Sequence, residues 1–415
     1  MIWIYTIGIA LFSVTMKLAS FFNRKARLFT EGRKDVFKEI SKLINPADHP
    51  IWFHFASLGE FEQGRPVLER LKLTYPKEKI IITFFSPSGF EIRKNYTGAD
   101  GVFYLPIDTV ANAKKFIALT QPKLAIFTKY EFWFHYFTEL NKKGIPLYLI
   151  SGIFRPSQAY FKWYGGFNRR ILKCVTHFFV QNEESLRLLT SIGINEVSLS
   201  GDTRFDRVYE NANSLKKLVE IAHFSSNFPI FIAGSTWLAD EKLLAAFPQR
   251  YPNWKLIIAP HEVDEAHILE IEKLFPNAIR FSTLRSELAV DPSANEICQA
   301  HVLLIDNIGM LSSLYQYAKV AYIGGGFGVG IHNTLEAAAF GLPVIFGPKY
   351  DKFQEAKDLI AIDAAKSISN EAELLSSFEY FKANENAAAA ARAYVKQKTG
   401  ATEMIIKIIK LNLVH

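Results

Sequence analysis

The stretch that decides the fold is VAYIGGGFGVGIHNTLE, at residues 320–336. A buried apolar run, Val320–Ile323, passes into five glycines within seven positions and then into a helix that begins near Thr334. Backbone N–H groups in such a loop, together with a helix N-terminus, can hold a phosphate without a metal ion. The stretch lacks the GKS/T of a Walker loop and does not follow the usual dinucleotide fingerprint. It predicts an α/β fold with a nucleotide site of another kind.

The same helix start also has a purely structural interpretation. Asn333 and Glu336 fit the N-cap and N3 positions of a capping box, which explains both residues without any ligand. A capping box does not require a glycine-rich approach, so the combination still favours a ligand site. Gly234-Ser235-Thr236 follows another apolar run and is a second turn whose N–H groups could face an anion.

Apolar runs alternate with helix-like stretches along the rest of the chain, and this alternation predicts parallel sheets with helices on both faces. The expected strands of the first set are Ile51–Ala56, Ile80–Phe85, Val102–Leu105, Leu124–Thr128, Leu147–Ile150 and Phe178–Val180, with helices such as Gly64–Leu73 and Val110–Leu119 between them. After a polar helical stretch around Leu215–His223, the second set is Ile230–Ala233, Lys255–Ala259, Val302–Ile305, Val320–Ile323 and Val344–Phe346. We therefore expect two doubly wound domains with a ligand cleft between them, outside the carboxyl ends of the strands.

Length and composition agree with two domains and an anionic partner. The chain has 415 residues, 49% of them hydrophobic, and a net charge of +7. No RNP-like or zinc-knuckle pattern is present, which disfavours nucleic acid as that partner. Cys174 and Cys298 are far apart and lack partner motifs, and His261 and His267 do not share a helical face, so no disulfide and no metal site is expected.

The N-terminus predicts a membrane anchor. Met1–Met16 carry no charged side chain, Lys17 interrupts, and Leu18–Phe22 resume the apolar run, which gives roughly the 20 residues needed to span a bilayer core. The positive charges follow this run, unlike those of a secretory signal peptide. The positive-inside rule then keeps everything after residue 22 in the cytoplasm. The alternative is a buried or interfacial helix of a soluble protein.

Three polar side chains near expected strand ends are candidates for chemistry. Glu60 and Glu131 each follow a strand, so both can face the cleft, Glu60 as a general base and Glu131 as its partner. Glu60 could equally stabilise the next helix's N-terminal dipole, and Glu131 could be a solvated surface residue. Arg204 could grip a phosphate or carboxylate, or form an ordinary ion pair with Asp202 or Asp206.

Taken together, these segments resemble the Kdo (3-deoxy-D-manno-octulosonic acid) transferases of lipopolysaccharide synthesis over nearly the whole chain. The motifs that carry the resemblance are the N-terminal anchor, Ala56-Ser57-Leu58-Gly59-Glu60, Tyr104-Leu105-Pro106-Ile107-Asp108, Glu131-Phe132-Trp133, Gly201 to Asp206, Gly234-Ser235-Thr236, His332 to Glu336, and Gly341-Leu342-Pro343-Val344. The resemblance implies a GT-B fold of two Rossmann-like domains that face each other across a cleft. It implies inverting transfer of Kdo from CMP-Kdo to the lipid A precursor (lipid IVA), without a metal or other cofactor, at the cytoplasmic face of the inner membrane.

The resemblance also assigns site residues. Glu60 matches the proton acceptor, and Glu131 and Arg204 match positions that stabilise the transition state. The CMP contacts fall on His261, Glu262, Ile308, Gly309, Met310, Asn333, Thr334, Leu335 and Glu336. This chain departs from the family pattern at Lys129, usually acidic, at Arg204, usually Lys, and at Pro260-His261-Glu262, Met310 and Thr334.

The expected domains are an anchor at 1–22, an acceptor-binding domain at 23–212, a nucleotide-sugar-binding domain at 213–386, and a C-terminal helix at 387–415 that packs back on the first domain. Two other functions fit the same features: a GT-B transferase that uses a UDP-sugar, and a membrane-tethered nucleotide-sugar binding protein without catalysis.

Overall fold

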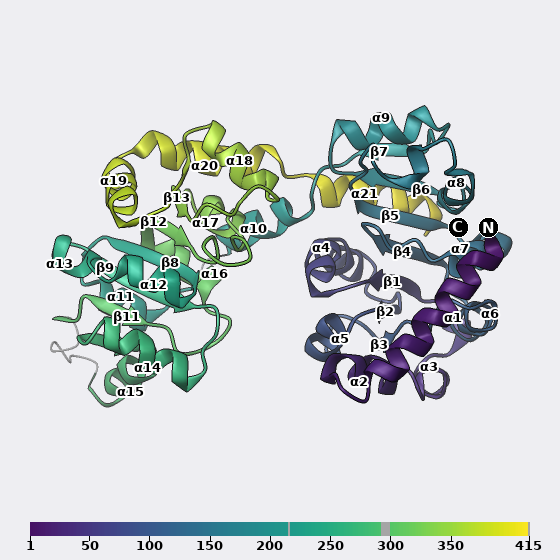
Figure 1. Cartoon of the computed structure of the whole chain (residues 1–415), viewed down its shortest axis with the longest axis horizontal. Helices are drawn as coiled ribbons and strands as arrows, with labels where there is room; N and C mark the ends of the chain where they lie inside the picture. The colour runs from purple at the N-terminus through teal and green to yellow at the C-terminus, as the bar shows by residue number, and fades with distance from the viewer. Residues whose placement is uncertain (215, 292–298, 414–415) are drawn as a thin grey trace. The chain divides into compact units, whose positions relative to one another are not determined.

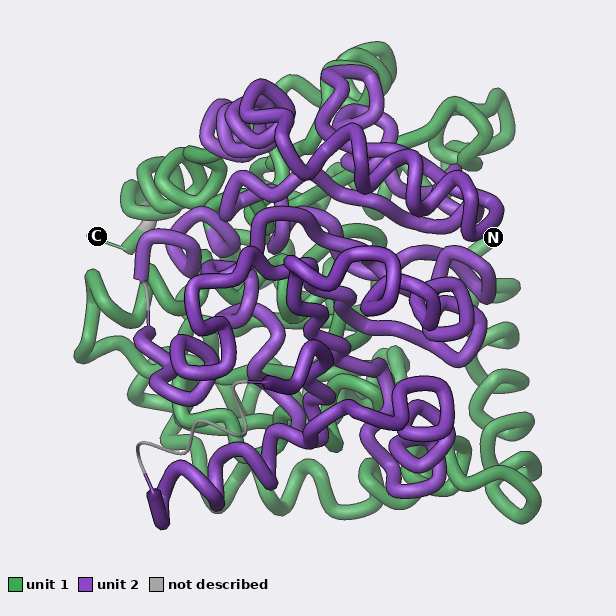
Figure 2. The backbone as a smooth tube through the Cα atoms, turned by 90° about the vertical axis from the view of Figure 1, so that its left-hand side faces the viewer, with its two compact units in different colours: residues 1–206, 399–415 green, residues 207–398 purple. Residues whose placement is uncertain are grey.

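The computed structural model describes residues 1–214, 216–291 and 299–413. Leu215 and Cys298, which enter the sequence-based predictions above, lie outside these residues. The chain forms two compact units, coloured separately in Figure 2. Unit 1 comprises Met1–Asp206 and Thr399–His415, and unit 2 comprises Arg207–Lys398. The chain therefore passes between the units at 206/207 and again at 398/399, whereas the sequence placed the boundaries at 212/213 and 386/387.

Unit 1 contains a parallel seven-stranded sheet with the strand order β3-β2-β1-β4-β5-β6-β7. Its strands are β1 (Ile51–Phe55), β2 (Ile80–Phe84), β3 (Gly101–Tyr104), β4 (Leu124–Thr128), β5 (Leu147–Gly152), β6 (His177–Val180) and β7 (Val197–Leu199). Its helices are α1 (Ile2–Ala19), α2 (Arg24–Glu31), α3 (Val36–Leu43), α4 (Leu58–Thr74), α5 (Pro87–Arg93), α6 (Val110–Thr120), α7 (Phe134–Lys142), α8 (Gly166–Leu172), α9 (Glu183–Ser191) and α21 (Ala401–Ile409).

Both faces of this sheet are buried, which explains why the strands are almost continuously apolar. Successive residues of a strand point to opposite faces. On β1, Trp52 belongs to the core that includes side chains of α3, α6 and α7. Ile51 and Phe53 belong to the opposite core, with side chains of α4 and α21. The apolar runs that predicted strands are therefore the centre of a three-layer unit.

Unit 2 repeats this architecture with the strand order β10-β11-β9-β8-β12-β13-β14, again all parallel. Its strands are β8 (Ile230–Thr236), β9 (Lys255–Pro260), β10 (Ala278–Arg280), β11 (Val302–Leu304), β12 (Ala318–Ile323), β13 (Val344–Phe346) and β14 (Ala365–Ser367). Its helices are α11 (Val219–Ser225), α12 (Leu238–Leu244), α13 (Phe247–Arg250), α14 (Glu265–Leu274), α15 (Phe281–Val290), α16 (Leu311–Leu314), α17 (Leu335–Ala339), α18 (Gln354–Ala361), α19 (Glu371–Phe381) and α20 (Glu385–Gln397). Helix α10 (Arg204–Asn213) contains the boundary at 206/207.

The C-terminal segment is two helices rather than the single helix expected from the sequence. α20 belongs to unit 2 and α21 to unit 1, with Gly400 between them in a left-handed conformation (φ 110°). The apolar side of α21, with Ile405, Ile406 and Ile409, is buried in the core of unit 1 beside α4. The prediction that the C-terminus packs on the first domain therefore applies to α21 only.

Helix α1 is long and apolar enough to cross a membrane, and none of its residues is buried. Figure 1 shows it as the purple helix that lies along one side of unit 1. Near its start, the Tyr5 hydroxyl donates to the Asp108 carboxylate (2.5 Å). Near its end, the Met16 carbonyl accepts a hydrogen bond from Thr30 of α2 (3.5 Å). Both ends of α1 are thus attached to unit 1.

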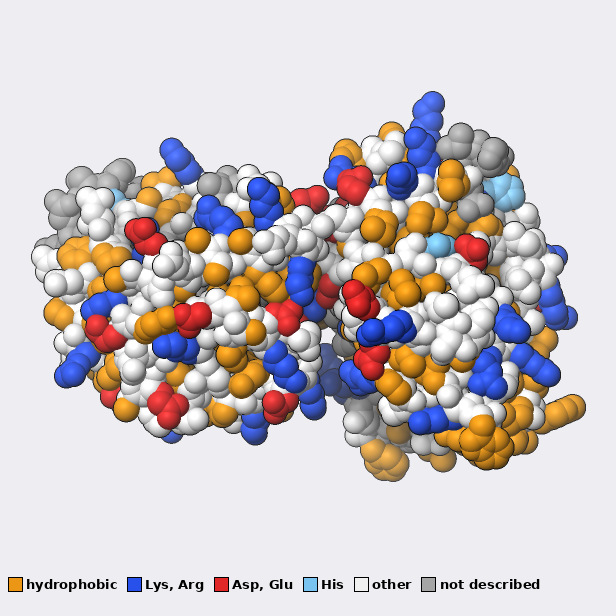
Figure 3. Space-filling view, turned by 90° about the horizontal axis from the view of Figure 1, so that it is seen from above, with side chains coloured by type: hydrophobic (Ala, Val, Ile, Leu, Met, Phe, Trp, Pro, Cys, Tyr) orange, Lys and Arg blue, Asp and Glu red, His pale blue; other side chains and the backbone are white. Residues whose placement is uncertain are grey.

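The opposite side of α1 and of the turn after it exposes large apolar side chains, which we call the outer stripe. They recur every three or four residues, as expected for one face of a helix. Figure 3 shows hydrophobic side chains gathered along the lower right edge of the molecule, where α1 lies. The exposed residues are Trp3, Ile4, Ile7, Leu11, Val14, Leu18, Phe21 and Phe22.

Candidate active site

The strand order of unit 1 reverses direction between β1 and β4, which is where open α/β sheets usually bind their ligands. The chain continues from β1 into the loop and helix that carry Glu60, and from β4 into the loop that carries Glu131. Sequence analysis placed both carboxylates at strand ends. The topology adds that these two strands are neighbours, so the two carboxylates share one edge of the sheet.

Glu60 lies in the first turn of α4, and its carboxylate turns back toward the preceding loop. There Oε2 accepts a hydrogen bond from the backbone N–H of Ala56 (2.6 Å). Burial, and after it the negative charge of Glu131, raise the pKa of Glu60 to about 7, against the opposing effects of the Ala56 N–H and the Lys129 charge. A carboxylate with such a pKa can accept a proton near neutral pH and still release it.

Glu131 is held by two ring nitrogens. The indole Nε1–H of Trp133 donates to Glu131 Oε2 (3.0 Å), and His54 Nε2 lies 3.4 Å from the same oxygen. His54 is completely buried on β1, and its Nδ1 lies 2.8 Å from the Thr83 hydroxyl of β2. Burial lowers the pKa of His54, so its imidazole is neutral at physiological pH. A row of hydrogen-bonding groups thus extends from the interior of the sheet to Glu131.

His54 and Lys129 are among the members of this site that were not predicted as functional residues. His54 was counted only as part of an apolar strand, although a histidine within a fully buried strand needs a polar partner and in that way signals a site. Lys129 was noted only as a departure from the family pattern. It follows β4 with a left-handed backbone (φ 60°), and its positive charge lowers the pKa of Glu60. In this chain, Lys129 is therefore part of the electrostatic environment of Glu60.

Arg204 forms the ion pair that sequence analysis gave as its structural alternative. Its Nε and Nη2 both lie 2.8 Å from Asp202 Oδ2, and its backbone N–H donates to Asp202 Oδ1 (2.9 Å). The neighbouring Thr203 hydroxyl donates to the carbonyl of Gln63 in α4. This contact attaches the Arg204 loop to the helix that carries Glu60. Arg204 is therefore a fixed guanidinium whose charge is shared with Asp202.

In unit 2 the strand order reverses between β8 and β12. Gly234-Ser235-Thr236, predicted as a turn after a strand, is instead the end of β8, with Ser235 in a left-handed conformation (φ 54°), whereas the glycine-rich loop does follow β12. Asp240 links the two segments, because its carboxylate accepts hydrogen bonds from the backbone N–H groups of Trp237 and Gly325 and from the Tyr322 hydroxyl. A Cβ at Gly324 would lie 2.3 Å from the Ser235 carbonyl oxygen. Part of the glycine content of this loop therefore serves to pack its backbone against the end of β8, whereas sequence analysis had attributed the glycines wholly to the approach of a ligand.

A stack of three rings lies at the carboxyl ends of these strands. The His261 ring stacks on His332 with centroids 4.2 Å apart and lies 4.9 Å from the Trp237 ring. The Trp237 Nε1–H donates to His332 Nε2 (3.2 Å). Burial, followed by the effect of His261, lowers the pKa of His332 to about 4, so this imidazole is a neutral acceptor at pH 7. Of the three, sequence analysis had named only His261 as a site residue.

The remaining predicted nucleotide contacts differ in how accessible they are. Glu262 and Ile308 are exposed, and Gly309 and Met310 lie beside Ile308 in the loop before α16. Helix α17 begins at Leu335 with Thr334 as its N-cap, so the capping box expected of Asn333 and Glu336 is not formed. Asn333 instead accepts a hydrogen bond from the Leu335 backbone N–H (3.0 Å) and donates to Glu336 Oε1 (3.0 Å). The side chains of Thr334 and Leu335 are fully buried. Asn333 and Glu336 therefore have a structural role at this helix start, and this role does not depend on a bound ligand.

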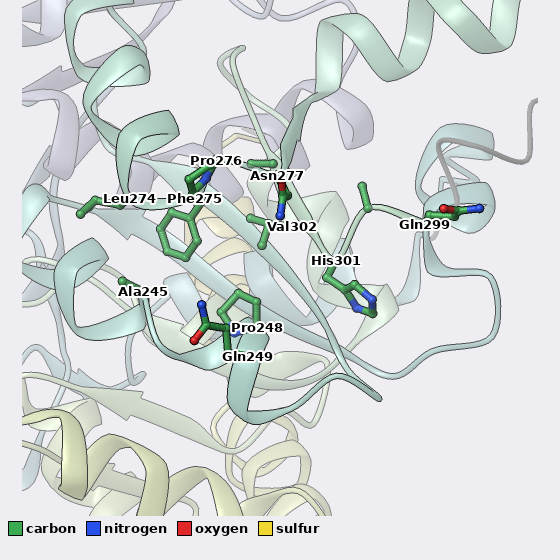
Figure 4. Close-up of a pocket in the computed structure, with 12 residues that line it drawn as sticks. Ala245, Pro248, Gln249, Leu274, Phe275, Pro276, Asn277, Gln299, His301 and Val302 are labelled. Carbon is green, nitrogen blue, oxygen red and sulfur yellow. The ribbon is translucent and has the colours of Figure 1, made fainter.

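A large open pocket of unit 2 lies elsewhere (Figure 4). It has a volume of about 590 Å³ and lies near the starting ends of β10 and β11, between residues such as Pro248, Phe275, Asn277 and His301. Among the residues that the structure describes, those that line it include no predicted site residue and no acidic, lysine or arginine side chain. We therefore do not assign the chemistry to this pocket.

Comparisons with known proteins show what the chain is similar to. Residues 26–207 match the family model described as 3-deoxy-D-manno-octulosonic-acid transferase (kdotransferase). The curated 3-deoxy-D-manno-octulosonic acid transferase of Aquifex aeolicus is 29% identical over 335 residues, covering 78% of this chain and 84% of the relative. That of Haemophilus influenzae is 28% identical over 348 residues, covering 80% of this chain and 78% of the relative.

Solved structures confirm the fold. A UDP-GlcNAc 2-epimerase from Neisseria meningitidis superposes with a TM-score of 0.60 at 16% identity, covering 87% of this chain and 99% of that one. A putative UDP-N-acetylglucosamine 2-epimerase from Listeria monocytogenes gives 0.58 at 12% identity, covering 87% and 96%. The predicted GT-B class, with two doubly wound Rossmann-like units, is confirmed. The chain is therefore similar over most of its length to Kdo transferases, which are glycosyltransferases.

Proposed function

We propose that this protein transfers Kdo from CMP-Kdo to the lipid A precursor lipid IVA, with inversion at the anomeric carbon and without a metal ion. The observation that carries the proposal is the environment of the Glu60 carboxylate. Its carboxylate has a pKa of about 7 at the switch point of unit 1, beside a second carboxylate, in a chain similar to Kdo transferases.

The reaction is a direct displacement in which Glu60 is the base. A glucosamine hydroxyl of the acceptor gives its proton to Glu60 as its oxygen forms a bond to the anomeric carbon of Kdo. The bond from that carbon to the phosphate oxygen breaks on the opposite face, and its electron pair leaves with CMP. Positioned general-base catalysis typically contributes about 10²–10⁴-fold to such a step. Glu131, fixed by Trp133 and His54, repels the ionised form of Glu60 and keeps its proton affinity high.

Unit 2 supplies the donor site in this proposal. The CMP contacts are expected from His261 and Glu262, from the exposed loop of Ile308, Gly309 and Met310, and from the helix start at Asn333, Thr334, Leu335 and Glu336. The Trp237–His261–His332 stack offers an aromatic surface beside these residues. Arg204, which also forms an ion pair with Asp202, contributes positive charge that stabilises the leaving phosphate.

We further propose that α1 holds the protein at the cytoplasmic face of the inner membrane while lying in the membrane plane. The hydrogen bonds between Tyr5 and Asp108 and between Thr30 and Met16 support this, because a helix that crosses the bilayer would have to break at least one of them. The outer stripe supplies the apolar face, and Arg24 and Lys25 supply exposed positive charge, as interfacial helices require.

The decisive experiment compares Glu60→Gln with Glu62→Gln, a matched change on the same helix. Each variant is incubated with CMP-Kdo and lipid IVA in detergent, and products are measured by mass spectrometry. We expect Glu60→Gln to lower kcat about 10²–10⁴-fold with little change in the KM for CMP-Kdo, and Glu62→Gln to retain most activity. Near-normal turnover by Glu60→Gln would remove the base from the mechanism. Transfer from a UDP-sugar instead, or loss of activity with chelator, would overturn the donor or the metal-free scheme.

A further inference from the structure

An apolar groove in unit 1 has no role in the mechanism above. It lies between α1, α2 and the loop after β2 and has a volume of about 410 Å³. We call it the α1–α2 groove. Its lining is mostly apolar and includes Phe12, Met16, Ala19, Phe29, Phe85 and Ser86. Phe12 is exposed, so the groove opens at the surface of the helix that carries the outer stripe.

The groove is held in shape by a half-buried cation. The guanidinium of Arg33 donates to the backbone carbonyls of Phe29 (2.8 Å) and Phe85 (2.6 Å), and its carbon lies 3.7 Å from the centre of the Phe29 ring. The Phe29 and Phe85 rings then meet edge to face, 5.3 Å apart. The aromatic walls formed by Phe29 and Phe85 are thus held in place by Arg33 and by each other.

One wall of the groove continues directly into the candidate active site. Ser86 lines the groove and donates its backbone N–H to the carbonyl of Ala56 (2.9 Å), and the N–H of Ala56 binds the Glu60 carboxylate (2.6 Å). On the same wall, the Phe85 ring lies 4.6 Å from the ring of Trp133, which donates to Glu131. Each site carboxylate is therefore separated from the groove by a single residue.

The surface around the groove is basic. Lys25 lines it, and Arg24 and Arg27, on the same short helix, are exposed. A ligand that fits this arrangement combines an alkyl chain with a negatively charged headgroup.

We propose that the α1–α2 groove holds one acyl chain of the phosphorylated lipid acceptor, and so places the acceptor's sugar hydroxyl beside Glu60. This inference rests on the proposed function, because it assumes that the acceptor is a lipid. It adds that unit 1 selects the acceptor by its alkyl chain as well as by its sugar. An acceptor without acyl chains loses this contact.

The test uses lipid IVA with a photoreactive diazirine near the end of one acyl chain, added to the full-length protein in detergent micelles. After irradiation, we expect crosslinks in the peptides that contain Phe12–Ala19 or Phe85, and we expect unlabelled lipid IVA to compete them away. Ala19→Phe fills the groove and should lower this crosslinking and kcat/KM for lipid IVA by about tenfold or more. The matched control is Ala10→Phe, which makes the same change at an exposed residue of α1 that does not line the groove and should change neither value.

Crosslinking does not require transfer, so the groove and the reaction are tested separately. Wild-type protein that crosslinks at the groove but transfers no Kdo overturns the proposed function and supports the groove as a lipid site. Transfer with crosslinks elsewhere, or groove crosslinks that a diazirine phosphatidylethanolamine gives equally and lipid IVA does not displace, overturns the groove proposal. If Ala19→Phe unfolds, as judged by its melting temperature, Ala19→Leu makes the same comparison with less added bulk.

Discussion

At the scale of single residues, the chemistry depends on a carboxyl group that is charged only part of the time. The folded protein raises the pKa of Glu60 from 4.5 to about 7 through burial and the nearby charge of Glu131. The folded state therefore holds this proton more tightly than the unfolded chain does. Stability associated with Glu60 is fully present below about pH 4.5 and is lost as the pH rises toward 7. Ionised Glu60 therefore destabilises the folded state near neutral pH, which is consistent with a residue kept for function.

The same pKa determines how activity responds to pH. Because the base must be ionised, we expect kcat/KM to rise through about pH 7 and then level off. Replacing Glu131 with Gln removes the charge that repels ionised Glu60, so the midpoint of this rise should move to lower pH even if the rate falls. Steady-state kinetics from pH 5 to about 9 measure the midpoint. Glu62→Gln is the control and should leave it in place. A midpoint unchanged in Glu131→Gln would mean that the two carboxylates do not interact.

Sequence patterns located Glu60 and Glu131 because both follow recognisable apolar strands, and parallel strands end at the same edge of a sheet. The same patterns could not reveal the environment that gives these residues their properties. His54 lies within an apolar run and Asp240 at the start of an ordinary helix, so neither residue was identified as part of a site. The sequence allowed two interpretations of Arg204, a ligand contact and an ion pair, and the structure shows the ion pair with Asp202. Hydrogen-bond partners distant in sequence leave no local pattern.

At the scale of elements, the central strands were predicted to within a few residues, but three edge strands were not. β7, β10 and β14 have three residues each and are only partly buried, so they lack the apolar run that identifies a buried strand. Each lies at the edge of its sheet. Their pairing comes from the neighbouring strand, which a local sequence pattern does not record.

Helix α21 gives a prediction about stability at this scale. The Asp206 carboxylate is buried and accepts hydrogen bonds from the backbone N–H groups of Gly400 (2.6 Å) and Thr402 (2.7 Å), at the start of α21. Asp206→Asn replaces one acceptor oxygen by an NH₂ group and should destabilise this contact by about 1–3 kcal/mol. We expect faster hydrogen exchange across residues 401–409 and a lower melting temperature. The exposed change Asp351→Asn serves as the control. Unchanged exchange in α21 would show that burial of its isoleucines alone holds it.

At the scale of the whole molecule, each unit has its own sheet, core and switch point, and the chain passes between the units twice. Sequence analysis predicted this duplication because the strand pattern restarts. It could not predict that α21 returns to unit 1, since Gly400 separates two helices that read as one. The roles in the proposed reaction are divided between the two units: unit 1 is assigned the acceptor, the base and the membrane contact, and unit 2 is assigned the nucleotide.

The membrane contact can be tested on the outer stripe. Leu11 and Leu18 are both 62% exposed, and burying a leucine side chain in an apolar phase is worth roughly 1.5–3 kcal/mol. A Leu11→Glu/Leu18→Glu double variant should therefore bind vesicles of phosphatidylethanolamine and phosphatidylglycerol at least about tenfold more weakly in a flotation assay. Leu73→Glu changes a side chain that is 74% exposed on α4 and should bind like the wild type. Equal binding by all three proteins would exclude the outer stripe as the membrane contact.

Orientation separates a helix in the membrane plane from one that crosses it. With Tyr5 tied to Asp108, the N-terminus must stay on the same side of the membrane as the body of unit 1. A protease-sensitive tag placed before Met1 should therefore be cleaved in inverted membrane vesicles and protected in intact spheroplasts. A crossing helix gives the opposite result, because the positive charges after residue 22 would keep the rest of the chain in the cytoplasm and leave the tag outside. Cleavage in spheroplasts would mean that α1 leaves unit 1 in the membrane, and the α1–α2 groove would then lose the wall formed by Phe12 and Met16.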